Sequence, residues 1–285
     1  MKADHPYKAI AIINDCTDDN ARMRQELRTT SALGLSIAYL GVPKFSSIAA
    51  SGNVIDALDA AKGRPSIIMV NVAPRHGDAK RFKNGTPFGY FFYKDNLVIA
   101  SVSEATLTLV KKLKLVDSIR VLDPEEVLPL FAEVGMIDEN DIPWMLRTQF
   151  RSFNFVPRVA EYLALHKPEL PGEDFALSEI KDEPPAVWWI DNFGNLKTTL
   201  TEADIDFKAG KKIETEWGVF TCYDRLSDVP NNEFGCIVGS SGIGPHRFLE
   251  LVVQGKSAEE AFGARIGSHI LHTECANLHE HILDA

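Results

Sequence analysis

A carboxylate, two amides and an aromatic ring follow one another at the end of a short apolar run. The run Val187–Ile190 is rich in residues that favour strands, and Asp191, Asn192, Phe193, Gly194 and Asn195 come directly after it. Aspartate and asparagine side chains bond to nearby backbone, and glycine accepts a positive φ, so this cluster predicts a tight turn. The turn would present hydrogen-bonding groups and an aromatic face to a polar ligand. The alternative is an ordinary hairpin tip.

A second carboxylate, Asp15, occupies a similar position near the N-terminus. The continuously apolar run from Tyr7 to Ile13 predicts a strand buried on both faces, as in a parallel sheet. Ligands of open α/β sheets bind beyond the carboxyl ends of such strands, and Asp15 lies there. It could hold a polar ligand such as a ribose diol. The simpler interpretation is that Asp18 or Asp19 caps a helix over 21–33 and Asp15 only supports the turn. The two interpretations are compatible, because a cap and a ligand contact need different carboxylates.

A dense polar loop at 73–81 adds groups that can act as acids, bases or anion hosts. His76 titrates near neutral pH and could serve as a base, although a solvent-facing loop histidine is the simpler interpretation. Arg75 and Lys80 could equally host an anion or be surface charges. Near the C-terminus, histidines and glutamates could in principle bind a metal, but a helix with solvated histidines fits better, so no metal site is expected: His269, His272, Glu274, His279, Glu280 and His281.

The elements that must position these residues divide into two groups. Strands alternate with helices over 1–166, which predicts an α/β domain with a mostly parallel sheet. The segment 167–185 is predicted to be a linker because it is rich in Pro and Gly. Short strands with turn signals then predict a small antiparallel, β-barrel-like domain over 186–285. It is expected to end in a helix that Ser257 and Glu260 open as a capping box.

Composition excludes several classes of function. The 285 residues carry a net charge of −10, with no dense basic stripe, so broad nucleic-acid binding is disfavoured. The four cysteines form no CxxC pair, which argues against structural zinc and a disulfide scaffold and fits a reducing compartment. No apolar signal core or membrane-spanning run is evident, so we expect a cytoplasmic protein with no membrane partner.

Five ordered motifs resemble those of the S-adenosylmethionine (SAM) hydroxide adenosyltransferases, or SAM hydrolases, the relatives of fluorinase and chlorinase. The similarity covers nearly the whole chain. The opening block, the polar loop, a Lys-Asp-Asn hairpin, the Ile-Asp-x-Phe-Gly-Asn signature and a Ser-rich loop carry it: 14–19, 72–81, 93–98, 190–198 and 239–258. The resemblance implies an α/β domain followed by a β-barrel-like domain. It also implies a homotrimer with the ligand at the subunit interface.

The reaction that this family implies is attack of water or hydroxide on the ribose C5′ of SAM, which displaces methionine and yields adenosine. No metal and no cofactor is implied, since SAM is the substrate. Positioning and removal of water from the nucleophile would supply the catalysis. By resemblance, Asp15 holds the ribose, Asp191 and Asn195 surround the methionine amino group, Ser240 contacts its carboxylate and Phe193 lines the pocket. The full implied substrate-binding set is Asp15, Asp95, Asn96, Asp191, Phe193, Asn195, Ser240 and Ser241.

The sequence departs from the family where water is activated. The family aspartate of the polar loop is Ala73, its arginine is Lys80, and its histidine falls at Phe150 or Arg151. The replacement candidates for catalysis are Arg75, His76, Lys80 and Ser152, the last at a position where halogenases contact halide. On the strength of the five motifs, and despite these departures, we expect a SAM hydrolase-like enzyme. The alternatives are a non-catalytic SAM- or adenosine-binding protein, or a transferase with a changed nucleophile or nucleoside.

Overall fold

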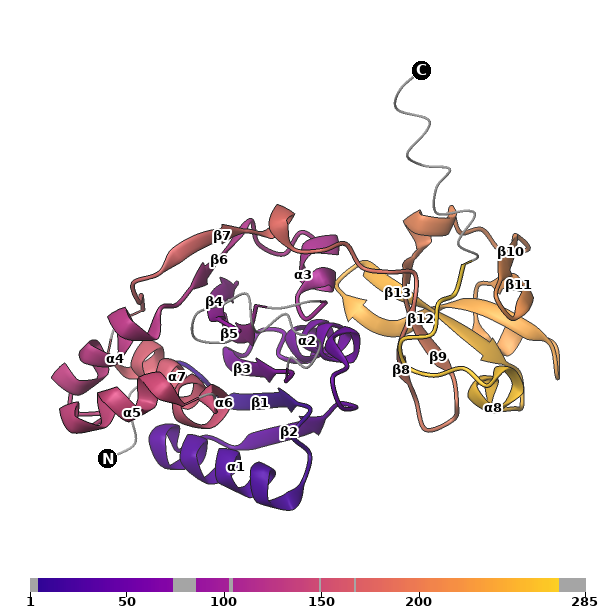
Figure 1. The fold of residues 1–285 in the computed structure, drawn as a ribbon. Helices are drawn as coiled ribbons and strands as arrows, with labels where there is room; N and C mark the ends of the chain where they lie inside the picture. Colours follow the sequence, from indigo (N-terminus) through magenta and orange to yellow (C-terminus); the bar gives the residue numbers. More distant parts are fainter. Residues whose placement is uncertain (1–4, 74–85, 103–104, 149, 167, 272–285) are drawn as a thin grey trace. The chain divides into compact units, whose positions relative to one another are not determined.

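The chain forms two compact units, Met1–Lys181 and Asp182–Ala285. The computed structural model describes residues 5–73, 86–102, 105–148, 150–166 and 168–271 (Figure 1). In that part of the chain, no helix is long and apolar enough to cross a membrane.

The N-terminal unit is an α/β domain built on a mixed sheet of order β2-β1-β3-β5-β4-β6-β7. The pairs β1–β2, β1–β3 and β3–β5 are parallel, and the strands beyond β5 are antiparallel. The parallel-leaning α/β fold predicted from the apolar runs is thus confirmed. The strands are β1 (Ala9–Asn14), β2 (Ile37–Gly41), β3 (Ser66–Asn71), β4 (Phe88–Tyr93), β5 (Asn96–Ser101), β6 (Ser118–Val121) and β7 (Glu173–Ala176).

Helices pack against this sheet and form a hydrophobic core with it. Side chains of α4 and α7, such as Leu128, Phe131 and Tyr162, pack with Ile12 and Met69 from the strands. The aromatic rings of Phe131 and Tyr162 lie 5.5 Å apart. The helices are α1 (Asp19–Leu33), α2 (Ser47–Ala60), α3 (Thr108–Lys112), α4 (Pro124–Glu133), α5 (Ile142–Arg147), α6 (Arg151–Asn154) and α7 (Val156–Leu165).

Helix α1 begins with an aspartate cap, as predicted for Asp18 or Asp19. Asp18 is the N-cap, and its carboxylate accepts a hydrogen bond from the backbone N–H of Ala21 at 2.9 Å. Gly34, at φ 65°, ends the helix, and its N–H donates to the carbonyl of Thr30. Asp15 takes no part in the cap, so its carboxylate has other partners.

The segment 167–185, predicted as a linker, contributes a strand to the first unit. Its residues Glu173–Ala176 form β7, which pairs antiparallel with β6 at the sheet edge. The Arg120 guanidinium on β6 also donates a 2.9 Å hydrogen bond to the carbonyl of Gly172, just before this strand. The compact units divide a few residues later, between Lys181 and Asp182.

The C-terminal unit is a curled, half-barrel-like sheet of order β10-β11-β12-β13-β9-β8, as the short strands predicted. All neighbouring pairs are antiparallel except β11–β12, in which buried Cys222 and Cys236 lie in register. The elements are β8 (Val187–Ile190), β9 (Leu196–Thr201), β10 (Lys212–Thr215), β11 (Gly218–Tyr223), β12 (Phe234–Ile243), β13 (His246–Val253) and α8 (Ala258–Phe262).

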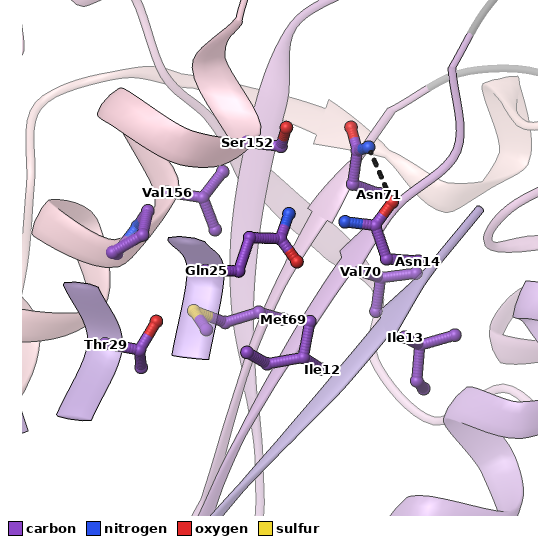
Figure 2. A pocket seen from close by; sticks show the side chains of 11 residues that line it. Ile12, Ile13, Asn14, Gln25, Thr29, Met69, Val70, Asn71, Ser152 and Val156 are labelled. Atoms are coloured by element: carbon purple, nitrogen blue, oxygen red, sulfur yellow. Dashed lines mark hydrogen bonds between the residues drawn. The ribbon is translucent and has the colours of Figure 1, made fainter. Parts of the chain in front are cut away.

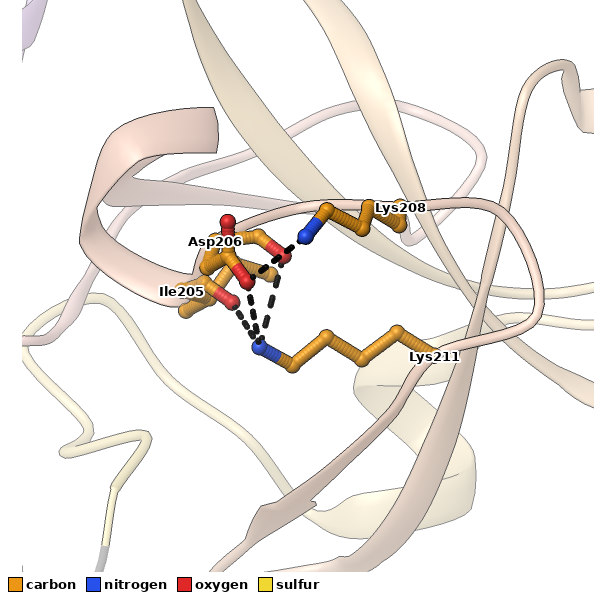
Figure 3. A network of polar contacts seen from close by, with 4 residues as sticks. All are labelled: Ile205, Asp206, Lys208 and Lys211. Carbon is orange, nitrogen blue, oxygen red and sulfur yellow. Dashed lines mark hydrogen bonds and ion pairs between the residues drawn. The ribbon is translucent and has the colours of Figure 1, made fainter.

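A lysine holds the connection between β9 and β10 (Figure 3). Lys211 Nζ donates to the carbonyls of Ile205, at 2.6 Å, and Asp206, at 3.3 Å. Asp206 adopts the left-handed conformation, with φ 47°. A hydrogen bond from Lys208 lowers the pKa of the Asp206 carboxyl. These contacts fix the turn that leads from β9 into β10.

We expect Leu128→Ala to lower the free energy of unfolding by about 2–5 kcal/mol, because it leaves a cavity in a fully packed core. Leu128 is 1% exposed, whereas Leu27, 63% exposed on α1, supplies the matched control. Leu27→Ala should change the free energy by no more than about 0.5 kcal/mol. Urea denaturation followed by fluorescence would measure both, and equal losses would contradict this packing.

Candidate functional site

Asp15 ties three segments together at the carboxyl edge of the parallel strands. Its carboxylate accepts hydrogen bonds from the backbone N–H groups of Ala73, at 3.1 Å to each oxygen, and Phe45, at 3.1 Å. The Cys16 thiol donates a longer contact of 3.8 Å. Only 7% of Asp15 is exposed. These backbone donors hold the carboxylate at the sheet edge where ligands of α/β folds bind.

Phe45 beside this carboxylate is held in an unfavourable backbone conformation. Its φ is 63°, a value that bulky residues seldom adopt, and its N–H is the one that bonds to Asp15. Its side chain is 39% exposed. Strain of this kind concentrates at functional sites, and Phe45 therefore joins the candidate residues. Sequence reasoning missed it because Pro43-Lys44-Phe45 carries no local signal for a positive φ.

The neighbouring residue Asn14 lines a small cavity with a mostly apolar surface (Figure 2). Its Oδ1 accepts hydrogen bonds from the N–H of Cys16, at 2.9 Å, and from Asn71 Nδ2, at 3.2 Å. The cavity has a volume of about 10 Å³, which is near the minimum for one water. Its polar lining residues, Asn14, Gln25, Thr29, Asn71 and Ser152, come from β1, α1, β3 and α6.

Three buried atoms of residues that line this cavity have no hydrogen-bond partner among the described residues: Asn14 Nδ2, Gln25 Oε1 and Thr29 Oγ1. Figure 2 shows the side chains of Asn14 and Gln25 extending toward one another. Unpartnered buried polar groups are costly, so a small hydrogen-bonding molecule would be stabilised here. Ser152, predicted to act on the nucleophile, lines this same cavity.

Phe150 and Arg151, the two candidates for the family histidine position, differ in burial. Phe150 is 68% exposed, whereas Arg151 is 6% exposed. The Arg151 guanidinium donates a weak 3.5 Å hydrogen bond to the carbonyl of Thr86, and its Nε has no partner among the described residues. Burial lowers the pKa of Arg151. Of the two, only Arg151 places a charge next to Ser152 in the chain.

Three of the four predicted catalytic residues, Arg75, His76 and Lys80, lie outside the described residues. Ala73, the position of the missing family aspartate, is described, and its backbone contacts Asp15. The water-activating role of this loop therefore stays a prediction.

Asp95 and Asn96 lie at the opposite edge of the sheet from Asp15. Asp95 lies in the turn between β4 and β5, and Asn96 begins β5, where its Oδ1 accepts a hydrogen bond from the N–H of Ser66 at 3.0 Å. Ser66 begins β3 and Asn71 ends it, so about 17 Å of strand separates this turn from the carboxyl edge. The structure does not bring these two residues to Asp15, and it gives Asn96 a role in aligning β3 with β5.

In the C-terminal unit, Asp191 organises the turn between β8 and β9. Its Oδ1 accepts from the N–H groups of Phe193, at 2.8 Å, and Asn195, at 3.0 Å, and its Oδ2 accepts from Asn195 Nδ2 at 3.0 Å. Gly194 has φ 79°, and a Cβ there would lie 2.1 Å from Ser257 Oγ. Phe193 is 71% exposed at the tip. The predicted tight turn is thus present, and it presents an aromatic face to its surroundings.

Ser240 and Ser241 lie in an irregular stretch of β12. The register with β13 shifts between Val238 and Gly242. Ser240 N–H donates to Glu250 Oε1 at 3.2 Å, and Ser241 Oγ accepts from Lys197 Nζ at 2.6 Å. Lys197 follows Asn195 by two residues. Lys197 therefore links the Asp191 turn to the serine pair through its hydrogen bond to Ser241, 44 residues further along the chain.

Among the described residues, no group of three or more His, Cys, Asp and Glu side chains could hold a metal ion. His269 is described, whereas His272, His279 and His281 lie outside the described range, as do Glu274 and Glu280. Helix α8 begins with the predicted cap, since the N–H of Glu260 donates to Ser257 Oγ at 3.1 Å.

Comparisons with known proteins agree with the fold and identify the second unit. Residues 185–271 match the SAM hydroxide adenosyltransferase C-terminal domain, a segment that contains the Asp191 turn and the serine pair. The match supports the predicted resemblance to SAM hydroxide adenosyltransferases over the C-terminal unit, and it indicates a SAM-related enzyme family. No curated protein matches the sequence.

Two crystal structures share the architecture. An uncharacterized conserved protein from Thermotoga maritima has a TM-score of 0.63 at 16% identity, covering 90% of this chain and 97% of that one. A conserved hypothetical protein from Thermus thermophilus has a TM-score of 0.58 at 18% identity, covering 93% of this chain and all of that one. At these identities the likeness establishes the fold.

We expect Asp15→Ala to accelerate hydrogen exchange at the amides of Phe45 and Ala73, because both lose their acceptor. The free energy of unfolding should fall by about 1–3 kcal/mol. Asp19→Ala, an exposed change at the start of α1, should leave both amides protected. Exchange measured by mass spectrometry would check this, and unchanged protection in Asp15→Ala would show that the carboxylate does not hold these loops.

Proposed function

We propose that this protein cleaves SAM at the ribose C5′–S bond with water, giving adenosine and methionine. The observation that carries the proposal is the cluster of Asp191, Asn195, Ser240 and Ser241 in a unit that matches the adenosyltransferase C-terminal domain. Asp191 Oδ2 accepts one hydrogen bond from Asn195, so it retains a lone pair for the methionine ammonium. Such a charge-assisted hydrogen bond is stronger than one between neutral groups.

In the proposed reaction, a water oxygen forms a bond to C5′ while the C5′–S bond breaks. The sulfur keeps the electron pair and leaves as the neutral thioether of methionine, and the water gives up one proton. Asp15, fixed at the carboxyl edge of the first unit, would accept hydrogen bonds from the ribose hydroxyls. Ser152 and the unpartnered polar atoms of the residues that line the same small cavity support a binding position for a water molecule.

The protein's assembly and auxiliary groups belong to the same proposal. We infer a homotrimer whose ligand lies between subunits, with SAM as substrate and no metal or cofactor. A cytoplasmic location is part of this inference. The base that receives the proton would be His76, and Arg75 and Lys80 would stabilise charge beside it.

A second candidate function is binding of SAM or adenosine without turnover. It is favoured by one observation, the alanine at position 73, whose backbone N–H bonds to Asp15 but whose side chain carries no acid or base. A changed nucleophile or nucleoside is a variant of the first proposal.

Calorimetry with SAM and with adenosine, followed by chromatography of the incubated mixture, separates these functions. We expect adenosine and methionine to accumulate in equal amounts and in excess over enzyme. Tight binding with SAM recovered intact would instead establish the binding protein, and the absence of binding would refute both.

We expect Asp191→Ala to weaken SAM binding roughly ten- to hundredfold, because the ammonium would lose a charged partner. Asn192→Ala, an exposed change in the same turn, is the matched control and should bind like the unaltered protein. Equal affinities for the two variants would remove Asp191 from the substrate site.

A further inference from the structure

Lys197 occupies a position that strand packing alone does not explain. It lies on β9 opposite Glu250 of β13, within a sheet whose neighbouring positions Leu196, Thr198 and Thr199 are buried. The Lys197 side chain is itself half-buried. Its Nζ donates to Ser241 Oγ at 2.6 Å, and it lies 5.8 Å from the centre of the Trp188 ring.

These contacts use only part of the bonding capacity of the ammonium. An ammonium carries three donors, and a neutral hydroxyl accepts one of them. The distance to the Trp188 ring is near the limit at which a cation–π contact stabilises a charge. Withdrawing a cation from water is costly unless an anion or several acceptors replace the solvent. The position therefore favours an anionic ligand that reaches Lys197 and Ser241 together.

The acidic side chain opposite Lys197 in the register, Glu250, supports the backbone of β12. Its Oε1 accepts the N–H of Ser240 at 3.2 Å, within the irregular stretch of that strand. A carboxylate so close would repel a ligand with two negative charges. It would tolerate a group with one negative charge, above all one that also carries a positive charge.

The same cluster offers partners for such a positive charge. Asn195 directly precedes β9, and its carbonyl accepts the N–H of Asp191 at 3.1 Å, which continues the pairing of β8 with β9. Side chains two residues apart in such paired chain lie on the same face, so Asn195 and Lys197 share a face of the sheet. Asn195 Nδ2 bonds to Asp191 Oδ2, which places a carboxylate next to that face. A cation and a carboxylate presented side by side match the carboxylate and ammonium of an α-amino acid.

We propose that Lys197, with Ser241, binds the α-carboxylate of the methionine part of SAM. This assignment rests on the proposed function and deepens it, since it names the residue that supplies positive charge to the carboxylate. Lys197 would thereby select ligands that end in an α-amino acid over nucleosides that lack one.

The test compares SAM with decarboxylated SAM, which has the same adenosine, sulfonium and amine but no carboxylate. Calorimetry should show that Lys197→Met weakens SAM binding roughly ten- to hundredfold and leaves the decarboxylated ligand within about twofold. Lys197→Arg should recover most of the affinity for SAM, because it keeps the charge. Lys212→Met, an exposed change on β10, is the matched control and should affect neither ligand.

Each outcome decides one point. Equal weakening of both ligands by Lys197→Met would show that Lys197 supports the sheet without touching the carboxylate, and would overturn the assignment. Unchanged SAM binding in Lys197→Met would overturn it as well. If the unaltered protein binds neither sulfonium compound, the proposed function itself fails, and the Lys197 assignment fails with it.

Discussion

The hydrogen bonds from the backbone of Phe45 and Ala73 to the Asp15 carboxylate are the constraint on which the first candidate site depends. Asp15 is only 7% exposed, and a buried carboxylate needs hydrogen-bond donors around it. Here the donors are backbone N–H groups. One side chain thus fixes where the segments after β1, β2 and β3 begin. It also holds Phe45 at a positive φ that the residue would otherwise avoid.

The C-terminal unit uses the same arrangement at smaller scale. Asp191 accepts two backbone N–H groups and the Asn195 amide within a five-residue turn. In both units, the carboxylate assigned to a ligand already determines the geometry of its own loop. Asp191 accepts three hydrogen bonds within its own turn, so one of its roughly four lone-pair positions stays open to a ligand, and structural support and ligand binding are compatible there. Preorganised groups of this kind lose little freedom when a ligand binds.

Local patterns predicted much of the fold but little of the spatial arrangement. The apolar runs indicated the parallel strands, and the aspartate before the helix indicated the cap of α1, because both signals depend on adjacent residues. The order of the motifs did not predict where Asn96 lies. Asn96 is the first residue of β5, and because β5 runs parallel to β3, this residue lies at the amino end of the parallel strands. The polar strand Glu173–Ala176 has no apolar alternation and was expected to be linker. Lys197 escaped notice because its partner Ser241 is distant in sequence.

Gly194 places an unusual restriction on how this protein can diversify. Because an added Cβ would lie 2.1 Å from Ser257 Oγ, position 194 and the N-cap of α8 cannot change independently. Ser257 in turn accepts the N–H of Glu260, so replacing it to make room would cost the helix its cap. Combinatorial libraries that randomise the turn to alter ligand preference should therefore keep both residues fixed and vary Asn192 and Phe193, whose side chains are exposed.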